Sequence, residues 1–504
     1  MEVVQSILQK VTRLHMLAHN VLRGVLTEQN YEIFFILILL LLVAIYWFSM
    51  YPNNGDLKQQ GSPSLPPYAE SGYIETLQKL ASNEVPLEFL RWAKGTCPVF
   101  RLRLPFSAKT MVANDLNLFK KILCDPDSYK PPHLYEGFIG ETMFSAEGQR
   151  WRHVRKSVVK TFSSNRVREM NEIATNITKE FMADKLDMFM EKGEPFDLCY
   201  ELLNLMLSAI CHVAFEYSMS EEEKDTFLED LRITFIESRY RNVPFRKWVG
   251  PFIPNIKRAQ KCANSIKALG NKILQAHRTK EVTKRGTIID CIVNDESYES
   301  DAERVNDLIV FLVAGHDTTA YSLAWILLEL AKNPKEQNTL RDELRKMPFV
   351  KRHECNPMKN VIKEGMRLHP VAALGSIRKT AKEYTLNLLH SETGVVTIPK
   401  DSTIFFSNFL LMRNPRYYDN PEEFRPSRWE NPSPQSLAAF LPFSSGRRNC
   451  VGQPLANLEL CTVLSHLVSK YHFSVADAGR REFYFTMKPG GAWLFVSKAL
   501  DTAN

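Results

Sequence analysis

The chain has 504 residues, with 64 Lys and Arg against 57 Asp and Glu, for a formal net charge of +7. This small excess argues against a nucleic-acid partner, which requires a concentrated basic surface. The nine cysteines are odd in number and not spaced as a disulfide framework, which argues against a disulfide-stapled secreted domain and favours a reducing compartment. No internal repeat or long linker divides the chain after residue 70, so one large domain is expected there.

The first 70 residues have the pattern of a membrane anchor and a hinge. Residues 33–50 form an uncharged apolar run of about 18 positions, long enough for a tilted transmembrane helix. A cleaved signal peptide is disfavoured because the polar segment before this run is too long. Residues 1–32 contain an amphipathic pattern that fits either an interfacial helix or a solvated one. Residues 51–69 hold Gly61-Ser-Pro-Ser-Leu-Pro-Pro67, which is stiff and extended and predicts a hinge.

The next segment predicts a small sheet and a basic helix. Residues 99–105 and 110–113 alternate as short strands do. Trp151 and Arg155 stand four positions apart and share one face of a predicted helix. By themselves they fit a solvated basic helix at least as well as a binding site. The other cations of this helix that would form a positive rim are Arg150, Arg152, Lys156 and Lys160.

From about residue 166 to 284 the pattern is helical and carries no catalytic signature. Residues 242–254 contain three prolines, Trp248 and several apolar residues. This composition fits either a lid that admits apolar molecules or a plain surface loop.

A long buried helix is predicted from about Ser300, where Ser and Glu303 form a capping box, to Lys332 before Asn333-Pro334. At about 30 residues it would span about 45 Å. The polar run Ala314-Gly-His-Asp-Thr-Thr319 interrupts its apolar middle with residues that disfavour a helix. Such a break indicates function. We expect Gly315 to leave a groove for a small ligand, with Asp317 and Thr318 able to hold or pass protons. A kinked helix with satisfied polar groups is the structural alternative.

A second helix is predicted from Pro357 to Leu368, followed by a strand over residues 371–377. Glu364 and Arg367 stand three positions apart in that helix. An isolated pair of this kind is usually an exposed salt bridge of little energetic weight.

The segment Phe443-Ser-Ser-Gly-Arg-Arg-Asn-Cys-Val-Gly452 precedes a helical pattern over residues 453–471. Cys450 would lie just before the N-terminus of this helix, where the dipole and Arg448 favour a thiolate. Gly446 and Gly452 would let the backbone turn tightly and approach a flat group. A lone thiolate is a poor zinc or iron–sulfur site but is sufficient for haem iron, where it favours O–O cleavage. A buried structural cysteine is the alternative.

The pattern F-x-x-G-x-R-x-C-x-G resembles the haem-binding loop of the cytochrome P-450 superfamily. W-x-x-x-R at residue 151, A-G-x-D-T-T at 314 and E-x-x-R at 364 follow the family's order. The resemblance implies a mainly α-helical fold with small β-sheets, as one haem domain over residues 70–504 behind the N-terminal transmembrane helix. It also implies haem b (iron protoporphyrin IX) as the cofactor.

The resemblance also implies roles for individual residues. Cys450 ligates the iron, and Thr318 and Asp317 deliver protons to reduced dioxygen. Trp151, Arg155 and Arg378 bind the haem propionates. Phe443, Gly446 and Arg448 belong to the haem-binding loop. Arg428 completes a structural cluster with Glu364 and Arg367.

Three functions are compatible with these residues. The leading one is a monooxygenase acting on a lipophilic fatty acid, sterol, terpenoid or xenobiotic. Because the chain has no G-x-G-x-x-G fingerprint, its electrons would come from an NADPH-dependent flavoprotein reductase. The second is a reductase-independent isomerase or dehydratase of lipid peroxides, against which the intact Asp317–Thr318 pair argues. The third is a non-enzymatic haem protein that senses gas or carries electrons.

The location is the point on which the residues and the resemblance disagree. Lys10, Arg13 and Arg23 precede the apolar run, and only Lys58 follows it closely, which by the positive-inside rule places the N-terminus in the cytosol. The resemblance implies instead a single-pass protein of the endoplasmic reticulum membrane with a cytosolic catalytic domain, and this is the location that we predict.

Overall fold

The structure is a computed structural model that describes residues 65–93, 98–104, 109–131, 140–162, 164–238, 253–280, 286–387 and 395–499. The predicted anchor and amphipathic segment, most of the hinge and nearly all of the predicted lid lie outside these ranges. The α-helices are α3 (Tyr73–Leu80), α4 (Val85–Ala93), α5 (Leu116–Leu123), α6 (Gly148–Val159), α7 (Ser164–Phe181), α8 (Asp187–Lys192), α9 (Leu198–Phe215), α10 (Glu221–Ser238), α12 (Pro254–Arg278), α13 (Ile288–Val293), α14 (Asp301–Lys332), α15 (Pro334–Arg345), α16 (Asn356–Leu368), α17 (Asn408–Leu411), α18 (Pro434–Ala439) and α19 (Gln453–Lys470).

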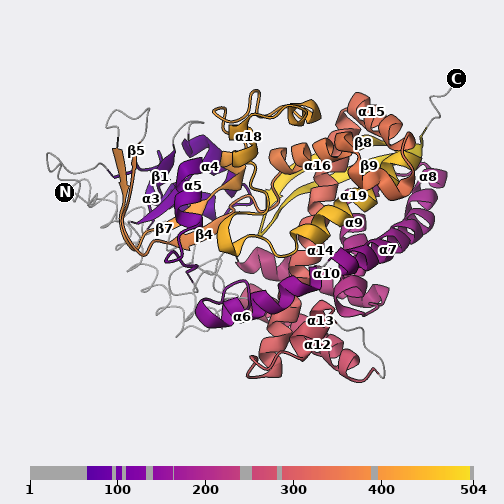
Figure 1. Ribbon diagram of the computed structural model, residues 1–504, viewed down its shortest axis with the longest axis horizontal. Coiled ribbons are helices and arrows are strands. Elements are labelled where there is room, and N and C mark those ends of the chain that lie inside the picture. Colours follow the sequence, from indigo (N-terminus) through magenta and orange to yellow (C-terminus); the bar gives the residue numbers. More distant parts are fainter. Residues whose placement is uncertain are drawn as a thin grey trace, which may run out of the picture.

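The strands form small sheets, of which those with β1, β4, β5 and β7 lie to one side of the helical body and the one with β8 and β9 lies among the helices (Figure 1). Their bounds are β1 (Val99–Arg101), β2 (Thr110–Ala113), β3 (Phe196–Asp197), β4 (Ser376–Lys379), β5 (Tyr384–Asn387), β6 (Val395–Ile398), β7 (Thr403–Phe406), β8 (Tyr471–Phe483) and β9 (Met487–Lys498). One sheet has the order β1-β2-β7-β4, with β2 and β7 parallel and the other pairs antiparallel. The others are β3-β9-β8 and the hairpin β5-β6. This confirms the predicted fold class of mainly helices with small sheets.

Helix α14 is the centre of the helical body. It packs against α9, α12, α16, α19 and the β8–β9 hairpin, and its residues belong to two of the three hydrophobic clusters. The predicted capping box begins it, since the Ser300 side chain accepts a hydrogen bond from the Glu303 backbone N–H. Asn333-Pro334 ends it, as predicted, because Pro334 starts α15.

The strand predicted over residues 371–377 is wrong in its position. Residues 371–375 form a turn, and β4 begins only at Ser376. Gly375 has φ +61° and lies close to the end of strand β7. A Cβ at this position would lie 2.0 Å from the Phe406 carbonyl oxygen. Arg378 therefore lies inside β4 rather than beyond it.

Candidate functional site

Cys450 lies on the loop that leads into α19. Its backbone N–H donates to the Phe443 carbonyl at 2.9 Å, which closes the loop at the other end of the motif. Gly452 is the N-cap of α19 and Pro454 stands in its first turn, where the missing N–H is harmless. The side chain of Cys450 is exposed, so the loop presents its sulfur rather than burying it in the core. All the cysteines in the described ranges are free thiols.

The two glycines of the loop have different roles. Gly446 has φ +74°, and a Cβ there would lie 2.5 Å from the Leu123 carbonyl oxygen, so only glycine lets the loop lie against the end of α5. Gly452 has φ −82°, and its nearest neighbour would be the Cys450 sulfur at an ordinary 3.9 Å. Gly452 does lie in the predicted turn, but its φ is one that other residues also adopt.

The protein around Cys450 acts on its pKa in both directions. Although Cys450 is exposed, the surrounding chain removes much of the water from around its sulfur. This desolvation raises the pKa of the Cys450 thiol, and it is the largest effect. The backbone N–H groups of Gly452 and Gln453 and the charge of Arg155 lower it. The helix N-terminus and Arg155, rather than Arg448, thus oppose the effect of burial, but the pKa of Cys450 stays above its usual value. The prediction that the loop by itself favours a thiolate is therefore wrong.

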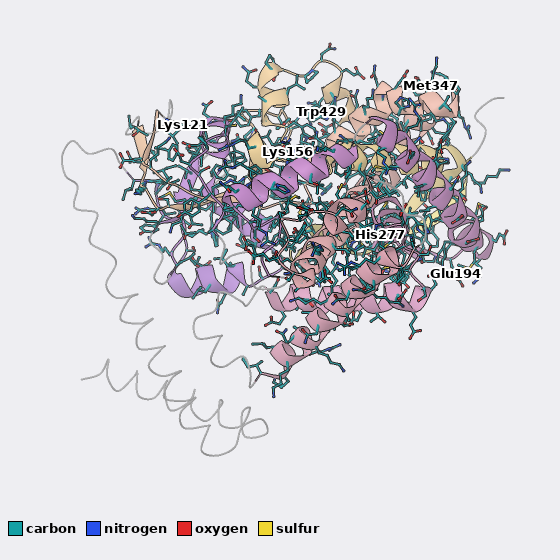
Figure 2. All side chains as sticks on the ribbon, turned by 60° about the horizontal axis from the view of Figure 1, so that its bottom comes forward. Lys121, Lys156, Glu194, His277, Met347 and Trp429 are labelled. Carbon is teal, nitrogen blue, oxygen red and sulfur yellow. The ribbon has the colours of Figure 1, made fainter. Side chains whose placement is uncertain are left out.

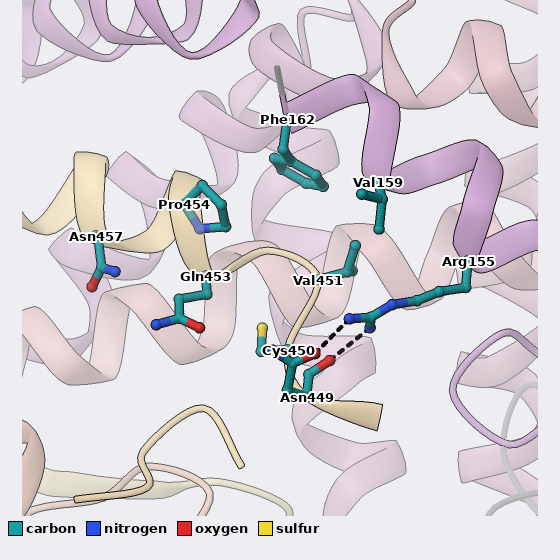
Figure 3. A pocket seen from close by; sticks show the side chains of 9 residues that line it. All are labelled: Arg155, Val159, Phe162, Asn449, Cys450, Val451, Gln453, Pro454 and Asn457. Carbon is teal, nitrogen blue, oxygen red and sulfur yellow. Dashed lines mark hydrogen bonds between the residues drawn. The ribbon is translucent and has the colours of Figure 1, made fainter. Parts of the chain in front are cut away.

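Arg155 reaches from α6 to the cysteine loop. Its Nη1 and Nη2 donate to the backbone and side-chain oxygens of Asn449, each at 2.6 Å, as Figure 3 shows. Beside them is a pocket of about 390 Å³, lined by Arg155, Val159, Phe162, Asn449, Cys450, Val451, Gln453, Pro454 and Asn457. The pocket joins the thiol to the outer surface of α6 and α19.

Arg448 is held by the segment before α6 and by α6 itself. Its Nη2 donates to the Ala146 carbonyl at 2.5 Å and lies 2.6 Å from Glu147 Oε2. The guanidinium stacks 4.0 Å from the centre of the Trp151 ring. Its Nη1 is buried and has no hydrogen-bond partner among the described residues. One donor is thus left for a group outside the chain.

Lys130, which the sequence reading did not single out, lies among these cations. Its Nζ donates to the Phe144 carbonyl at 2.7 Å, and burial, followed by the charges of Arg378 and Arg448, holds its pKa well below the usual value. The charge of Arg155 also lowers the pKa of Lys130, whereas the carboxylate of Glu147 raises it. Arg378 itself is buried in β4.

This cationic cluster of the buried Lys130 and Arg378 and the half-buried Arg155 and Arg448 fits a cofactor that carries two carboxylates. Like charges this close repel one another in a poorly solvated site, and a dianion would relieve the repulsion. A haem combines two carboxylates with an iron that a single thiolate can ligate. No cluster of three or more His, Cys, Asp or Glu side chains suited to a metal ion occurs in the described part of the chain.

Helix α14 has one open stripe in its buried middle. Between Asp307 and Ala331 every residue is buried except Val310, Ala314, Gly315 and Thr318. Val310, Ala314 and Thr318 are four positions apart, so they share one face. The Thr318 hydroxyl donates to the Ala314 carbonyl at 2.8 Å. The helix therefore offers a small polar group on a face that its neighbours leave uncovered.

Gly315 does not provide that opening. A Cβ at Gly315 would lie 2.6 Å and 2.7 Å from Cδ1 and Cγ1 of Ile210 in α9. The glycine is needed because α9 packs directly against the α14 backbone. The open stripe is formed by Val310, Ala314 and Thr318 instead, and a groove for a small ligand there stays a prediction.

Asp317 points away from the open stripe. It is buried, and it accepts a hydrogen bond from the Thr486 hydroxyl in the turn between β8 and β9. Burial raises its pKa to about 6, against the lowering effects of Thr486, Lys488 and Tyr321. Its neighbour His316 is also buried and packs against Phe227, and burial lowers the pKa of His316 to about 4. The structure thus separates the carboxyl of Asp317 from the hydroxyl of Thr318.

The predicted Glu–Arg–Arg cluster is confirmed. Glu364 and Arg367 are fully buried and make two hydrogen bonds of 2.9 Å. Arg428 Nε donates to Glu364 at 2.8 Å, and Trp429 Nε1 donates to it at 2.9 Å. The pair is thus a buried network that ties α16 to the segment before the cysteine loop, not an exposed salt bridge.

The predicted basic rim is smaller than expected. Arg152 and Lys156 are exposed on α6, and Lys160 is exposed directly after its last residue. The three follow one another at intervals of four residues, and Figure 2 labels Lys156 on this helix. Arg150 instead pairs with Glu141 at 3.3 Å and Glu303 at 3.2 Å. Three cations therefore remain for a partner on this face.

Comparisons with known proteins agree with this geometry. The family model described as Cytochrome P450 matches residues 63–494. Cytochrome P450 4c21 of Blattella germanica is 24% identical over 85% of this chain and 91% of its own length. The mitochondrial sterol 26-hydroxylase of Rattus norvegicus is 29% identical over 65% of this chain and 66% of its own length. A crystal structure of a cytochrome P450 has the same fold, with a TM-score of 0.70 at 19% identity, and the match covers 82% of this chain and 98% of that one.

The predicted location in the endoplasmic reticulum membrane is contradicted. The sterol 26-hydroxylases of Rattus norvegicus and Mus musculus, each 29% identical to this chain, are mitochondrial by name. Two described helices, α9 and α14, are long and apolar enough to cross a membrane. However, 67% and 78% of their most apolar windows are buried inside the protein, so both are core helices. The prediction failed because it took its compartment from the resemblance, and one fold serves in several compartments.

The family match spans most of the chain, and the thiol, the cationic cluster and the interrupted core helix agree with it. The chain therefore belongs to the cytochrome P450 family, and it is a haem-dependent oxidoreductase of the monooxygenase type.

Proposed function

We propose that this protein inserts one atom of O2 into a lipophilic substrate and releases the other atom as water. The observation that carries the proposal is the meeting of an exposed thiol, Cys450, with a group of cations around the buried Lys130. A thiolate-ligated haem b, when bound, supplies the activation of dioxygen. The open stripe on α14 supports the assignment of the oxygen side.

In this proposal the chain's own residues hold the cofactor and manage protons. Cys450 would ligate the iron, and Gly446 and Phe443 fix its loop. The Thr318 hydroxyl, which donates to the Ala314 carbonyl in this structure, would turn toward the open stripe to pass a proton, and Asp317 would resupply that proton. The residues proposed to hold the two carboxylates are Lys130, Trp151, Arg155, Arg378 and Arg448.

The substrate is proposed to be a fatty acid, sterol, terpenoid or xenobiotic. Because two relatives are named sterol 26-hydroxylases, sterols are the first compounds to test. The test is a spectral titration of the purified ferric protein against such a library, followed by product analysis with O2 and an electron donor. A protein that purifies without haem, or whose reduced carbonyl adduct lacks the red-shifted band of a thiolate ligand, would refute the proposal. Product from a lipid hydroperoxide without any electron donor would favour the peroxide isomerase.

The electron donor is proposed to be an NADPH-dependent flavoprotein reductase that docks through an acidic surface. Arg152, Lys156 and Lys160 support this because they are exposed cations on, or directly after, the helix that also carries Arg155. Reversing Arg152 and Lys156 to Glu should weaken reduction at low salt and spare haem incorporation. The matched control reverses Lys257 and Lys335, exposed on α12 and α15. Equal reduction of both double variants would refute the docking site, and reduction only by a ferredoxin would replace the flavoprotein.

We propose that residues 70–504 form the catalytic unit. Residues 33–50 would attach it to a membrane, residues 1–32 would precede the anchor and residues 51–69 would act as the hinge. A chain that lacks residues 1–64 should keep the thiolate-haem spectrum and leave the membrane fraction. Loss of the haem from this chain would contradict the division.

A further inference from the structure

The cysteine loop contains a residue with an unusual backbone conformation. Ser444 has φ +63°, a value that disfavours a residue with a Cβ and that therefore needs support from its surroundings. The Phe443 carbonyl belongs to the planar peptide unit that joins Phe443 to Ser444, so φ at Ser444 sets the direction of this carbonyl. The same carbonyl accepts the Cys450 N–H at 2.9 Å. The conformation of Ser444 therefore decides whether the loop closes on Cys450.

A pair of hydroxyl groups holds Ser444 against a strand. Ser444 Oγ lies 2.9 Å from the Oγ of Ser376, the first residue of β4. The backbone N–H of Ser444 donates to the Leu441 carbonyl at 3.0 Å, which connects Ser444 only to its own turn. The hydrogen bond to Ser376 is thus the contact that joins this strained residue to another element of the fold.

The backbone on both sides of Ser376 is held in place. Directly before it, the Gly375 N–H donates to the Ala372 carbonyl at 2.8 Å. Within β4, Ser376 lies opposite Phe406 of β7 in an antiparallel pair. The hydroxyl that meets Ser444 is therefore presented by a strand end that does not depend on the cysteine loop for its position.

The same strand positions two cations of the cluster. Arg378 stands two positions after Ser376, so both side chains leave the same face of β4. Because the Ser376 hydroxyl meets the cysteine loop, this face is turned toward the loop. Lys379 exchanges two backbone hydrogen bonds with Tyr129, at 2.7 and 3.2 Å, and Lys130 is the next residue. Strand β4 therefore carries Arg378 and fixes the place of Lys130.

We propose that the hydroxyl pair of Ser376 and Ser444 sets the position of Cys450 relative to Arg378 and Lys130, and that both serines are positioning residues for the cofactor. The inference rests on the proposed function. A haem is flat and rigid, so the ligand of its iron and the partners of its carboxylates must be held at a matching separation. The pair provides that match because it ties the loop that carries the ligand to the strand that places the cations.

Loss of the pair has a defined consequence for the ligand. Without the bond from Ser376, Ser444 is released toward negative φ, which residues with a Cβ prefer. This rotation turns the Phe443 carbonyl away from the Cys450 N–H. The loop then opens, and the thiolate ligand should be lost from the iron more readily.

The first test measures how long the thiolate ligand survives. Ser376→Ala removes the hydroxyl at a regular strand position, and Ser376→Thr keeps a hydroxyl there. In Ser376→Ala the red-shifted band of the reduced carbonyl adduct should disappear about fivefold faster, the change that one ordinary hydrogen bond supports. Ser376→Thr should restore the wild-type lifetime. The matched control is Ser71→Ala, which removes another hydroxyl pair, with Thr76 at 2.7 Å, and its lifetime should equal that of the wild type.

A double variant tests whether the two serines act together. Ser444→Ala should shorten the lifetime by the same factor as Ser376→Ala. The combination of both should shorten it no further, because each substitution removes the same bond. If either alanine variant does not fold, Ser444→Gly is measured in its place, since glycine accepts a positive φ, and a wild-type lifetime in that variant would overturn the proposal.

Hydrogen–deuterium exchange reports on the loop without turnover or carbon monoxide. The Cys450 N–H, followed in a peptide of residues 443–450 from the ferric protein, should exchange about fivefold faster in Ser376→Ala than in the wild type. The same peptide in Ser71→Ala should exchange at the wild-type rate. A folded Ser376→Ala protein with wild-type lifetime and wild-type exchange would refute the positioning role. Equal effects of Ser71→Ala, or additive effects in the double variant, would also refute it.

The two ideas fail in distinguishable ways. A wild-type protein without a thiolate-ligated haem contradicts the proposed function, and the inference fails with it. A wild-type protein that binds haem through the thiolate and forms product, with a Ser376→Ala variant that matches it in lifetime and exchange, leaves the function intact and removes only the role of the two serines.

Discussion

Substitution of Gly315 by Ala distinguishes close helix packing from a ligand groove. The new Cβ would lie 2.6 Å from Ile210 Cδ1 and 2.7 Å from Cγ1, well inside van der Waals contact. Ile210 is only 2% exposed, so its side chain has little room to turn aside. The substitution therefore pushes α9 away from α14 or strains Ile210.

The expected magnitude follows from two opposing effects. Overpacking of a close-packed core costs about 1–3 kcal/mol. Alanine recovers about 1 kcal/mol over glycine in a helix interior. The net loss of stability should be about 0–2 kcal/mol. Ile210→Val alone should cost about 0.5–1.5 kcal/mol. In the double variant the close contact with Cδ1 is removed while the 2.7 Å contact with the γ carbon remains, so the loss should be smaller than the sum by about 0.5 kcal/mol.

The assay is urea denaturation of the haem-loaded protein and its three variants, followed by tryptophan fluorescence. Substrate-induced spectral shifts of the same proteins are the second readout. The packing interpretation is refuted if Gly315→Ala unfolds like the wild type but no longer gives a spectral shift, and Ile210→Val does not rescue it. That result would mean that the methyl group projects into the ligand space.

Three other predictions follow from buried charges. Glu364→Gln should destabilise the protein by about 3–5 kcal/mol, because it leaves Arg367 buried without its anion. The control Glu343→Gln changes an exposed pair, and its stability in urea denaturation should stay within about 0.5 kcal/mol of the wild type. Similar denaturation midpoints for the two variants would contradict this. Asp317 has its pKa raised from 3.8 to about 6 in the folded protein. As the pH rises, the unfolded chain releases this proton first, so the stability of the fold decreases as the pH rises from about 4 to about 6. Asp317→Asn should therefore gain about 3 kcal/mol relative to wild type over this window, and a difference that does not change with pH would exclude the effect. Lys130→Met should weaken haem retention, measured by transfer of haem to apomyoglobin, and an unchanged transfer rate would remove Lys130 from the cofactor site.

Local patterns predicted several elements correctly because each depends on neighbouring residues. The limits of α14 follow from the Ser300 cap and from Pro334, which are decided within one helical turn. The first turn of α19 accepts Pro454 for the same reason. Cys450 and its neighbours could be singled out because a single thiol between glycines and arginines fits few kinds of chemistry.

The folded chain decided which of those residues meet. Lys130 carries no local signal, and its place among Arg155, Arg378 and Arg448 arises from contacts between segments hundreds of positions apart. The same holds for Gly315, which faces Ile210 across a helix interface, and for Thr486. Sequence spacing alone determined what the chain could bind and where its longest helix runs. Only the tertiary structure determined which way each buried side chain points, because packing against distant segments, rather than the order of neighbours, selects that direction.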